Sequence, residues 1–365
     1  MYYHIKNKII KPFNAIKKNL IIYNSKKNWI IFLKNLIALT KAKKLSNGNK
    51  IKAIRFFNFY GIKLKNTYAH QYYTSITGQF YENYIPDDIF HSVILPKFNN
   101  SVQWPALLDK NLYDRLFVNF SQPKYIIKNI NGYFYSNNQL ISLNQAISIL
   151  NNQKEELIIK PSIRSGGGKM INFFKVKKST TNYKNLKIND LFELYKKDFI
   201  IQEILDQCKI LKELNPTSLN TLRVLSFFRN NDVVILSTVL RMGGKDSRID
   251  NYGKGGSICG VGDTGYLKSN SYKENGEITN TSPSGLKLDG ILIPNFPKVT
   301  NMVKALHSKI PYFKIVSWDI ALDINDAPVF IEYNTYAQGI DIHQITNGPL
   351  FGKFQDEILR SIFLN

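Results

Sequence analysis

The sequence predicts an α+β protein that combines antiparallel strands with helices. Two apolar runs, 315–323 and 329–334, have the length and β-branched content of buried strands, and the polar segment 323–328 that links them is typical of a hairpin loop. A strand–loop–strand unit is predicted over 157–175, and a helix near 296–310. The length of 365 residues and the hydrophobic content of 44% are enough for about two domains with buried cores.

Residues 1–99 form a basic, aromatic-rich region that is predicted to be mainly helical. No Asp or Glu precedes Glu82, whereas sixteen Lys and Arg do, so most of the excess positive charge lies here. One interpretation is that basic amphipathic helices lie on an anionic membrane surface or bind an acidic polymer. The other is that the apolar residues pack on the rest of the protein, while the charge reflects a general bias toward Lys, Asn and Ile.

Residues 100–156 are expected to supply a linker and the first segment of the next domain. A helix that carries Lys110 is predicted over 105–117, because its apolar residues roughly follow helical spacing. A hairpin is expected around the dipeptide Asn131-Gly132, which suits a tight turn, and a helix is expected over 143–153.

The rest of the chain divides into 157–205, which holds a glycine-rich loop, and 206–365, which holds the carboxylate-bearing strands. Further strands are predicted at 199–203, 222–228 and 233–241.

The stretch 243–257 is too glycine-rich and charged for a core element, so we expect a mobile loop over the site. Lys254 and Arg248 are its candidates for contact with phosphate or an acidic substrate, and an ordinary solvated loop is the alternative. His343, which follows the last predicted strand, is expected to be a solvated loop histidine.

The strand at 157–160 ends in Lys160 and leads into the glycine-rich loop. Bare backbone N–H groups in such a loop can close over phosphate oxygens. The loop does not match a P-loop, because Ile163 stands at the first glycine position, Met170 stands at the last position, and a strand follows instead of a helix. The loop residues that we expect to contact phosphate are Ser165, Gly166, Gly167 and Gly168.

Carboxylates in the two apolar runs point to a metal site. Asp319 lies in the first run, and Glu332 and Asn334 lie in the second. A buried, unpaired carboxylate costs several kcal/mol unless a cation or a donor satisfies it, and positions two apart on a strand face the same side. Asp319, Glu332 and Asn334 would therefore offer the oxygen ligands that Mg²⁺ takes when it also holds nucleotide phosphates.

Other motifs are weak or absent. A literal G-x-G-x-x-G ends at Gly265, but no helix follows it, so we interpret 263–265 as a hairpin turn. The chain has no kinase signature, no obvious Ser-His-Asp or Cys-His set, and no nucleic-acid-binding signature. Cys208 and Cys259 lie far apart without metal-ligand spacing, so neither a disulfide framework nor a zinc site is suggested. This cysteine usage favours a reducing cytoplasm as the compartment. No export signal or membrane span is expected.

The order of these motifs resembles that of the ATP-grasp superfamily, as in D-alanine:D-alanine ligases and the glutamate ligases that modify ribosomal protein. The motifs are Lys160-Pro161-Ser162 with its glycine loop, the strand at 199–203, Asp319, and Glu332-x-Asn334. The segments 214–224 and 250–256 are similar to the sugar-transfer-associated ATP-grasp group of bacterial surface-polysaccharide clusters. The resemblance covers roughly residue 104 to the end, and it implies two α+β subdomains that grip ATP between antiparallel sheets.

The resemblance also implies roles for individual residues. Lys110 and Lys160 match the two lysines that contact ATP phosphates, and Mg²⁺, as two ions, would bind at the metal set. The adenine-binding segment would be Gln202, Glu203, Ile204 and Leu205. Asp206 and Gln207 both lie close to the position of the ribose partner.

Two arginines in predicted strands complete the catalytic set. Arg223 and Arg241 carry planar guanidinium groups that suit phosphate or carboxylate. Each would neutralise the transferring phosphoryl group or clamp an acid, and ion pairing at a sheet surface is the alternative.

The function implied is that of an ATP-dependent carboxylate–amine ligase that acts through an acyl phosphate. The family context suggests addition of an amino acid or amine to a sugar acid, on a lipid-linked or nucleotide-linked sugar, in capsule or lipopolysaccharide synthesis. The enzyme would be cytoplasmic, or peripheral at the inner face of the membrane if the basic region binds lipid. The alternatives are a sugar or small-molecule kinase on the same fold, and a non-catalytic basic module that binds membrane or nucleic acid; no nucleic-acid partner is expected.

Overall fold

The computed structural model describes residues 22, 24–163 and 168–364. Its smaller sheet consists of β1 (Tyr125–Ile130), β2 (Tyr133–Ser136), β3 (Gln139–Ile141), β4 (Leu157–Pro161), β5 (Asn172–Phe174) and β8 (Phe199–Glu203). The larger sheet consists of β9 (Thr221–Arg229), β10 (Asp232–Met242), β11 (Ser257–Val261), β12 (Leu267–Lys273), β13 (Ile278–Thr279), β14 (Ile315–Leu322) and β15 (Pro328–Asn334).

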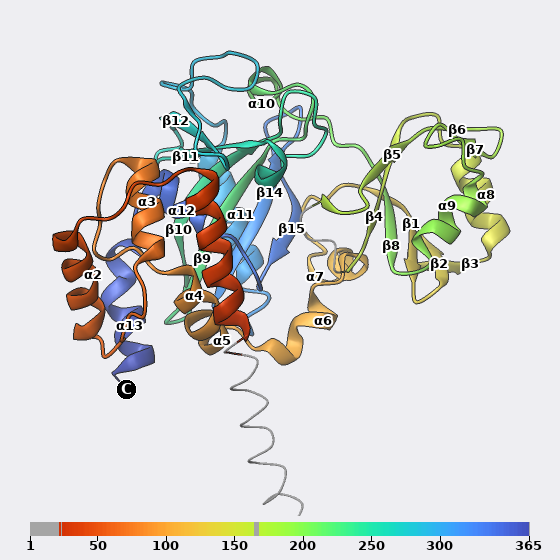
Figure 1. Cartoon of the computed structure of the whole chain (residues 1–365). Coiled ribbons are helices and arrows are strands. Elements are labelled where there is room, and N and C mark those ends of the chain that lie inside the picture. The colour runs from red at the N-terminus through yellow and green to blue at the C-terminus, as the bar shows by residue number, and fades with distance from the viewer. Residues whose placement is uncertain (1–21, 23, 164–167, 365) are drawn as a thin grey trace, which may run out of the picture.

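The two sheets belong to two lobes (Figure 1). Over the described residues, the small sheet has the order β3-β2-β1-β8-β4-β5 and the large sheet the order β13-β12-β11-β10-β9-β14-β15. Neighbouring strands in both sheets are antiparallel. Helices cover both sheets, which confirms the expected α+β class.

The small lobe follows the sequence prediction closely. Asn131 and Gly132 both have positive φ, 51° and 96°, as a tight two-residue hairpin turn requires, and β1 pairs with β2 around them. The predicted strand–loop–strand unit is present as the antiparallel pair β4 and β5. The apolar faces of α8 (Leu143–Asn151) and α9 (Ile188–Tyr195) pack on this sheet, and β6 (Val176–Lys177) and β7 (Thr180–Thr181) form a separate ribbon.

The prediction of a single helix over 105–117 is wrong. Its place is taken by α6 (Trp104–Leu107), η3 (Lys110–Leu112) and α7 (Tyr113–Leu116). The break has a local cause, because Asp109 is extended and its side chain accepts a hydrogen bond from the N–H of Asn111 at 2.9 Å, which starts a new turn. The N–H of Lys110 then donates to the carbonyl of Ser162 at 3.0 Å, so this segment is tied to the small lobe directly after β4.

The predicted hairpin of β14 and β15 is confirmed, and its register positions the charged residues. Asp319 lies directly opposite Glu332 on one side and opposite Arg223 of β9 on the other. All residues of β14 are buried, and α11 (Phe296–His307) contacts the sheet beside it. Trp318, next to Asp319, is fully buried in the core of this lobe, so the carboxylate is held on a rigid strand.

The described part of the N-terminal region is helical, as expected. Residues 24–39 are helical. The other elements are α2 (Asn47–Phe59), α3 (Tyr68–Thr77), α4 (Asp87–Ile89), η1 (Phe90–Ile94), α5 (Leu95–Phe98) and η2 (Ser101–Gln103). The remaining elements of the chain are α10 (Lys209–Leu214), η5 (Tyr252–Lys254), α12 (Asp341–Asn347), η6 (Gly352–Phe354) and α13 (Gln355–Phe363).

Apolar residues of this region pack on the large lobe. Phe57 of α2 shares a buried cluster with Leu359 of α13 and Phe227 of β9, and Tyr73 of α3 shares another with Ile345 of α12. The packing interpretation therefore accounts for these side chains, whereas residues 1–21 lie outside the described part. None of the described helices combines the length and apolarity needed to cross a membrane.

A buried glutamine joins the N-terminal region to α12. The side-chain oxygen of Gln344 accepts from the N–H of Ile85 at 2.8 Å, and its Nε2 donates to the carbonyl of Ile85 at 2.9 Å. Gln344 and Ile85 are both fully buried, so these two backbone groups depend on one side chain.

We expect Gln344→Ala to lower the free energy of unfolding by about 2–4 kcal/mol, because it leaves two buried backbone groups unpaired. Chemical denaturation of the full chain measures this change. The exposed Gln139→Ala is the control, with a change within about 0.5 kcal/mol. Equal stability of the two variants would show that the Gln344 contacts do not hold the N-terminal region in place.

Candidate functional site

A cavity of about 740 Å³ is lined by residues of both lobes. The predicted site residues that line it are Lys110, Lys160, Gly168, Gln202, Glu203, Ile204, Leu205, Asp206, Arg223, Arg241, Asp319, Glu332 and Asn334. Lys254 is exposed on η5 and is not among the described lining residues. Ser165, Gly166 and Gly167 lie outside the described residues.

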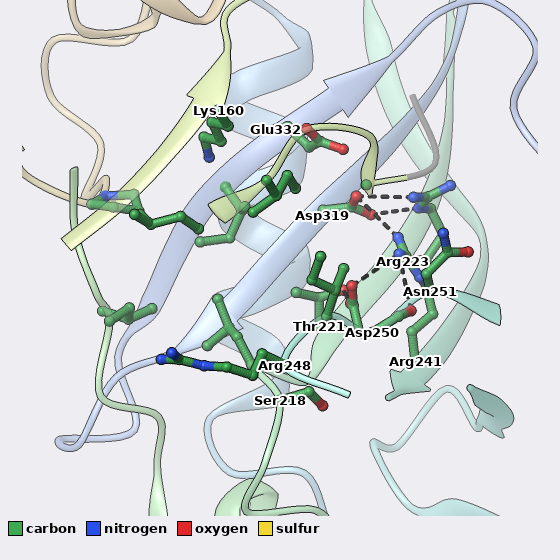
Figure 2. Close-up of a pocket in the computed structure, with 18 of the residues that line it drawn as sticks. Lys160, Ser218, Thr221, Arg223, Arg241, Arg248, Asp250, Asn251, Asp319 and Glu332 are labelled. Atoms are coloured by element: carbon green, nitrogen blue, oxygen red, sulfur yellow. Dashed lines mark hydrogen bonds and ion pairs between the residues drawn. The ribbon is translucent and has the colours of Figure 1, made fainter. Parts of the chain in front are cut away.

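Asp319 is held by two guanidinium groups. Arg223 donates to both of its oxygens, through Nε to Oδ1 and through Nη2 to Oδ2 at 2.9 Å, and Nη1 of Arg241 donates to Oδ2 at 3.1 Å. These bonds compensate a carboxylate side chain that is only 4% exposed (Figure 2). The second guanidinium nitrogen of Arg241 donates to Oδ1 of Asp250 at 3.0 Å.

A second cluster of charged side chains surrounds Glu332. Its Oε2 lies 3.1 Å from Nζ of Lys110. Burial alone would raise the pKa of Glu332, but the positive charges of Lys110, Lys160 and Arg223 outweigh burial and lower this pKa to about 2. Burial, helped by the nearby charge of Lys110 and opposed by Glu332, lowers the pKa of Lys160 to about 8. The site is therefore rich in cationic groups that suit an anionic ligand.

The oxygen donors of the predicted metal set share one face of the sheet. Asp319 and Glu332 are cross-strand partners, and Asn334 lies two positions from Glu332 on the same strand. Nδ2 of Asn334 is buried and has no hydrogen-bond partner among the described residues. Two carboxylates and an amide fit Mg²⁺, which usually takes one or two carboxylates and completes its shell with phosphate oxygens and water.

Asp319 has little spare capacity in this arrangement. Three N–H bonds fill three of its roughly four lone-pair positions. One position therefore remains for a cation, and a cation that uses more than one requires a guanidinium to move toward another anion. Within the described ranges, no group of three His, Cys, Asp or Glu side chains forms a metal-binding cluster.

The end of β8 and the residues that follow it line the cavity. Nε2 of Gln202 donates to the carbonyl of Pro123 at 3.1 Å, while its buried Oε1 has no partner in the part of the chain that the structure describes. Glu203 forms an exposed ion pair with Lys124 at 2.7 Å.

The two candidates for the ribose position differ in their surroundings. Gln207 is buried; it donates to the carbonyls of Asn215 and Ser218 and accepts from Asn220, so its amide is committed to the fold. Asp206, in contrast, is exposed and lines the cavity.

Sequence reasoning missed Asp250 and Thr221, which both line the cavity. Asp250 is 9% exposed; it accepts from Arg241 and from the hydroxyl of Thr221. The sequence signal for Asp250 is its position two residues after Arg248, in the loop that is expected to cover the site. The interpretation of His343 as a solvated loop histidine is wrong, because it lies buried in α12 with Nδ1 at 2.9 Å from Oγ of Ser237, and burial lowers its pKa to about 3.

Lys160→Met should raise the free energy of unfolding at pH 7 by about 1–3 kcal/mol. At pH 7 Lys160 is charged in both states, so the folded state bears the cost of burying that charge. Between pH 8 and 10.5 the folded protein loses this proton before the unfolded chain does, and the cost disappears as pH rises. The advantage of Lys160→Met should therefore shrink above pH 8.

Chemical denaturation at pH values from 6.5 to 10 measures this difference. The exposed Lys154→Met is the matched control, with a small difference at every pH. A Lys160→Met difference that stays constant with pH would contradict the assigned pKa shift.

Structural comparison finds proteins with low sequence identity. An L-amino acid ligase from Bacillus licheniformis has 11% identity and a TM-score of 0.40, and the match covers 70% of this chain and 47% of that chain. A D-alanine–D-alanine ligase from Bacillus anthracis has 12% identity and a TM-score of 0.39, with 73% and 70% covered. The biotin carboxylase domain of 2-oxoglutarate carboxylase from Hydrogenobacter thermophilus has 12% identity and a TM-score of 0.41, with 72% and 47% covered.

The chain thus spans about half the length of the first and the last of these proteins. No curated protein matches the sequence. The family model described as "Sugar-transfer associated ATP-grasp" matches residues 90–356, which is well over half of the chain. The expected fold is confirmed, and the chain belongs to the sugar-transfer associated ATP-grasp family.

Proposed function

We propose that this ATP-grasp protein is a carboxylate–amine ligase that joins an amine or amino acid to a sugar acid. The observation that carries the proposal is one cavity in which lysines and arginines surround the facing carboxylates Asp319 and Glu332. Cations from both lobes suit a polyanionic nucleotide bound between them.

The reaction would proceed in two steps. An oxygen of the sugar-acid carboxylate attacks the γ-phosphorus of ATP, and the bond to the β,γ-bridging oxygen breaks to give ADP and an acyl phosphate. The amine nitrogen then attacks the acyl carbon, inorganic phosphate leaves, and an amide remains after loss of the amine proton. Positioning and charge neutralisation supply most of the acceleration in such a reaction.

We assign the nucleotide contacts by position. Lys110 and Lys160 would bind phosphate oxygens, and Arg223 and Arg241 would neutralise the transferring phosphoryl group. Asp206 would hold the ribose, because the alternative, Gln207, is fully engaged in the fold. The adenine would lie against Gln202, Glu203, Ile204 and Leu205, with the loop at Ser165, Gly166, Gly167 and Gly168 over the phosphates.

Mg²⁺, as two ions, would neutralise the charge that develops on the phosphates. Asp319, Glu332 and Asn334 would hold it. Once phosphate is present, Arg223 and Arg241 have a second anion to contact, which would release lone pairs of Asp319 for the metal. Lys254 is proposed only as a contact for the acidic substrate from its exposed loop.

The proposed domain division follows this assignment. Residues 1–99 form the basic region, 100–156 the linker and first segment, 157–205 the glycine-loop subdomain, and 206–365 the metal-binding and substrate-binding subdomain. The basic region would attract an acidic or lipid-linked glycan at the inner face of the membrane, in capsule or lipopolysaccharide synthesis.

Glu332→Gln is expected to reduce Mg-dependent ATP turnover about 100-fold or more, because the change removes a negative metal ligand and leaves the lysines unbalanced. Turnover is measured with a panel of uronic sugars and amino acids by free phosphate and product mass. The exposed Glu193→Gln serves as the matched control and should keep full activity.

Each product pattern has one interpretation. Phosphate release that requires both an acid and an amine, together with a condensed mass, supports the ligase. A phosphorylated product without free phosphate identifies a kinase instead. Turnover of Glu332→Gln equal to that of the control contradicts the proposed metal site.

A further inference from the structure

Arg248 connects the large lobe to the small lobe. Its Nη1 and Nη2 donate to the two carboxylate oxygens of Glu156 at 2.8 and 2.6 Å, and its guanidinium carbon lies 3.7 Å from the ring centroid of Phe173. Glu156 immediately precedes β4, and Phe173 belongs to β5, so both partners are in the small sheet's lobe. The paired guanidinium lowers the pKa of the Glu156 carboxyl, as expected for a formed ion pair.

Asp250, two residues later, is fixed in the large lobe. Nη2 of Arg241 donates both to Oδ1 of Asp250 at 3.0 Å and to its backbone carbonyl at 3.1 Å, and the hydroxyl of Thr221 donates to Oδ2. The same Arg241 donates through Nη1 to Asp319. Asp250 therefore sets the position of the guanidinium that the proposed reaction places at the phosphoryl group.

Ile249 lies between these two anchors. It pairs with Leu219 of the large lobe in an isolated bridge, and a Cβ placed on Gly168 of the small lobe would lie 3.3 Å from its Cγ2. Figure 2 shows the Arg248 side chain pointing away from Asp250 and Arg241. Arg248 therefore contacts the small lobe, Ile249 lies beside the end of the glycine loop, and Asp250 contacts Arg241.

The segment 248–250 is short, so a movement of Arg248 relative to the large lobe also acts on Asp250. Three residues span at most about 10 Å, so they have little slack. A movement of the small lobe away from the large one must break the Arg248 contacts or pull on Asp250. An isolated exposed ion pair would be worth little, but this pair is bidentate, stacked on a ring and adjacent to a buried anchor.

We propose that residues 248–250 act as a strap that couples approach of the lobes to the position of Arg241. Arg248 and Asp250 are then positioning residues: contact with Glu156 and Phe173 holds the strap, and Asp250 in turn holds Arg241 beside Asp319. The role of Arg241 in chemistry rests on the proposed function, whereas the coupling between lobes does not.

The coupling is tested by the distance between the lobes. Spin labels at Lys177→Cys on the small lobe and Lys309→Cys on the large lobe report this distance by electron–electron double resonance; the native Cys208 and Cys259 are buried. Arg248→Glu and Glu156→Arg should each broaden the distribution toward longer distances. The double variant restores a pair of opposite charges and should restore the distribution.

A matched control lies within the large lobe. Arg229 also forms a bidentate pair, with Glu357 at 2.9 and 2.7 Å, and lies over the ring of Phe354 at 5.3 Å. Arg229→Glu breaks a similar pair without touching the strap, and it should leave the distance unchanged.

Asp250→Asn tests the second anchor. It keeps the shape of the side chain and removes its charge. The hydrogen bonds of Asp250 within the described part of the chain join it to Thr221 and Arg241 of the large lobe, yet the change should also broaden the distance distribution between the lobes. Retention of the wild-type distribution by Asp250→Asn or by Arg248→Glu would overturn the strap, and so would failure of the charge swap to restore it.

Nucleotide affinity separates this inference from the proposed function. Calorimetry with Mg²⁺ and the ATP analogue AMP-PNP should show about three- to tenfold weaker binding by Arg248→Glu, recovered in the charge swap. A wild type that does not bind AMP-PNP overturns the proposed function, while the distance measurement still decides on the strap.

Discussion

The candidate site depends on the charge balance around one buried carboxylate. Asp319 sits in a strand whose residues are all buried, and it is tolerated there because Arg223 and Arg241 reach it from the two strands that precede it in the sheet order. Removing either partner would leave a buried charge less well compensated. The strand order β10-β9-β14-β15 is therefore also an electrostatic arrangement that brings four charged side chains to one face.

The same balance extends to the lysines of the site. Glu332 partly offsets the charges of Lys110 and Lys160, while Asp319 and Asp250 pair with the arginines. A nucleotide would enter by exchange, because its phosphates can replace the protein carboxylates as partners of the cations. The carboxylates set free in this way would be available as ligands for the divalent metal of the proposed reaction.

Much of this arrangement could be predicted from the sequence. Asp319 and Glu332-x-Asn334 interrupt apolar runs, and the short hairpin loop 323–327 between the strands is enough to bring Asp319 and Glu332 opposite each other. The Asn131-Gly132 turn and the strands around the glycine loop likewise follow from local backbone preference. These predictions succeed because the decisive interactions are close in sequence.

The features that sequence reasoning missed depend on distant partners. Asp109 ends a helix through its own local hydrogen bond, which periodicity of leucines does not reveal. Asp250 is held by Arg241 and Thr221 on two separate strands, and His343 is buried where α12 packs against β10 and β11. Composition alone places Asp250 in a mobile loop over the site and His343 in a solvated loop, and it reveals the partners of neither residue.

The most direct test of the account is the Mg²⁺ dependence of AMP-PNP affinity in the wild type and in Asp319→Asn, with the exposed Asp263→Asn as control. If Asp319 is a metal ligand, Mg²⁺ should tighten binding about tenfold or more in the wild type and the control, and Asp319→Asn should lose this gain. Equal gains in all three proteins would contradict the role of Asp319 as a metal ligand, and an absence of AMP-PNP binding by the wild type would contradict the nucleotide site itself.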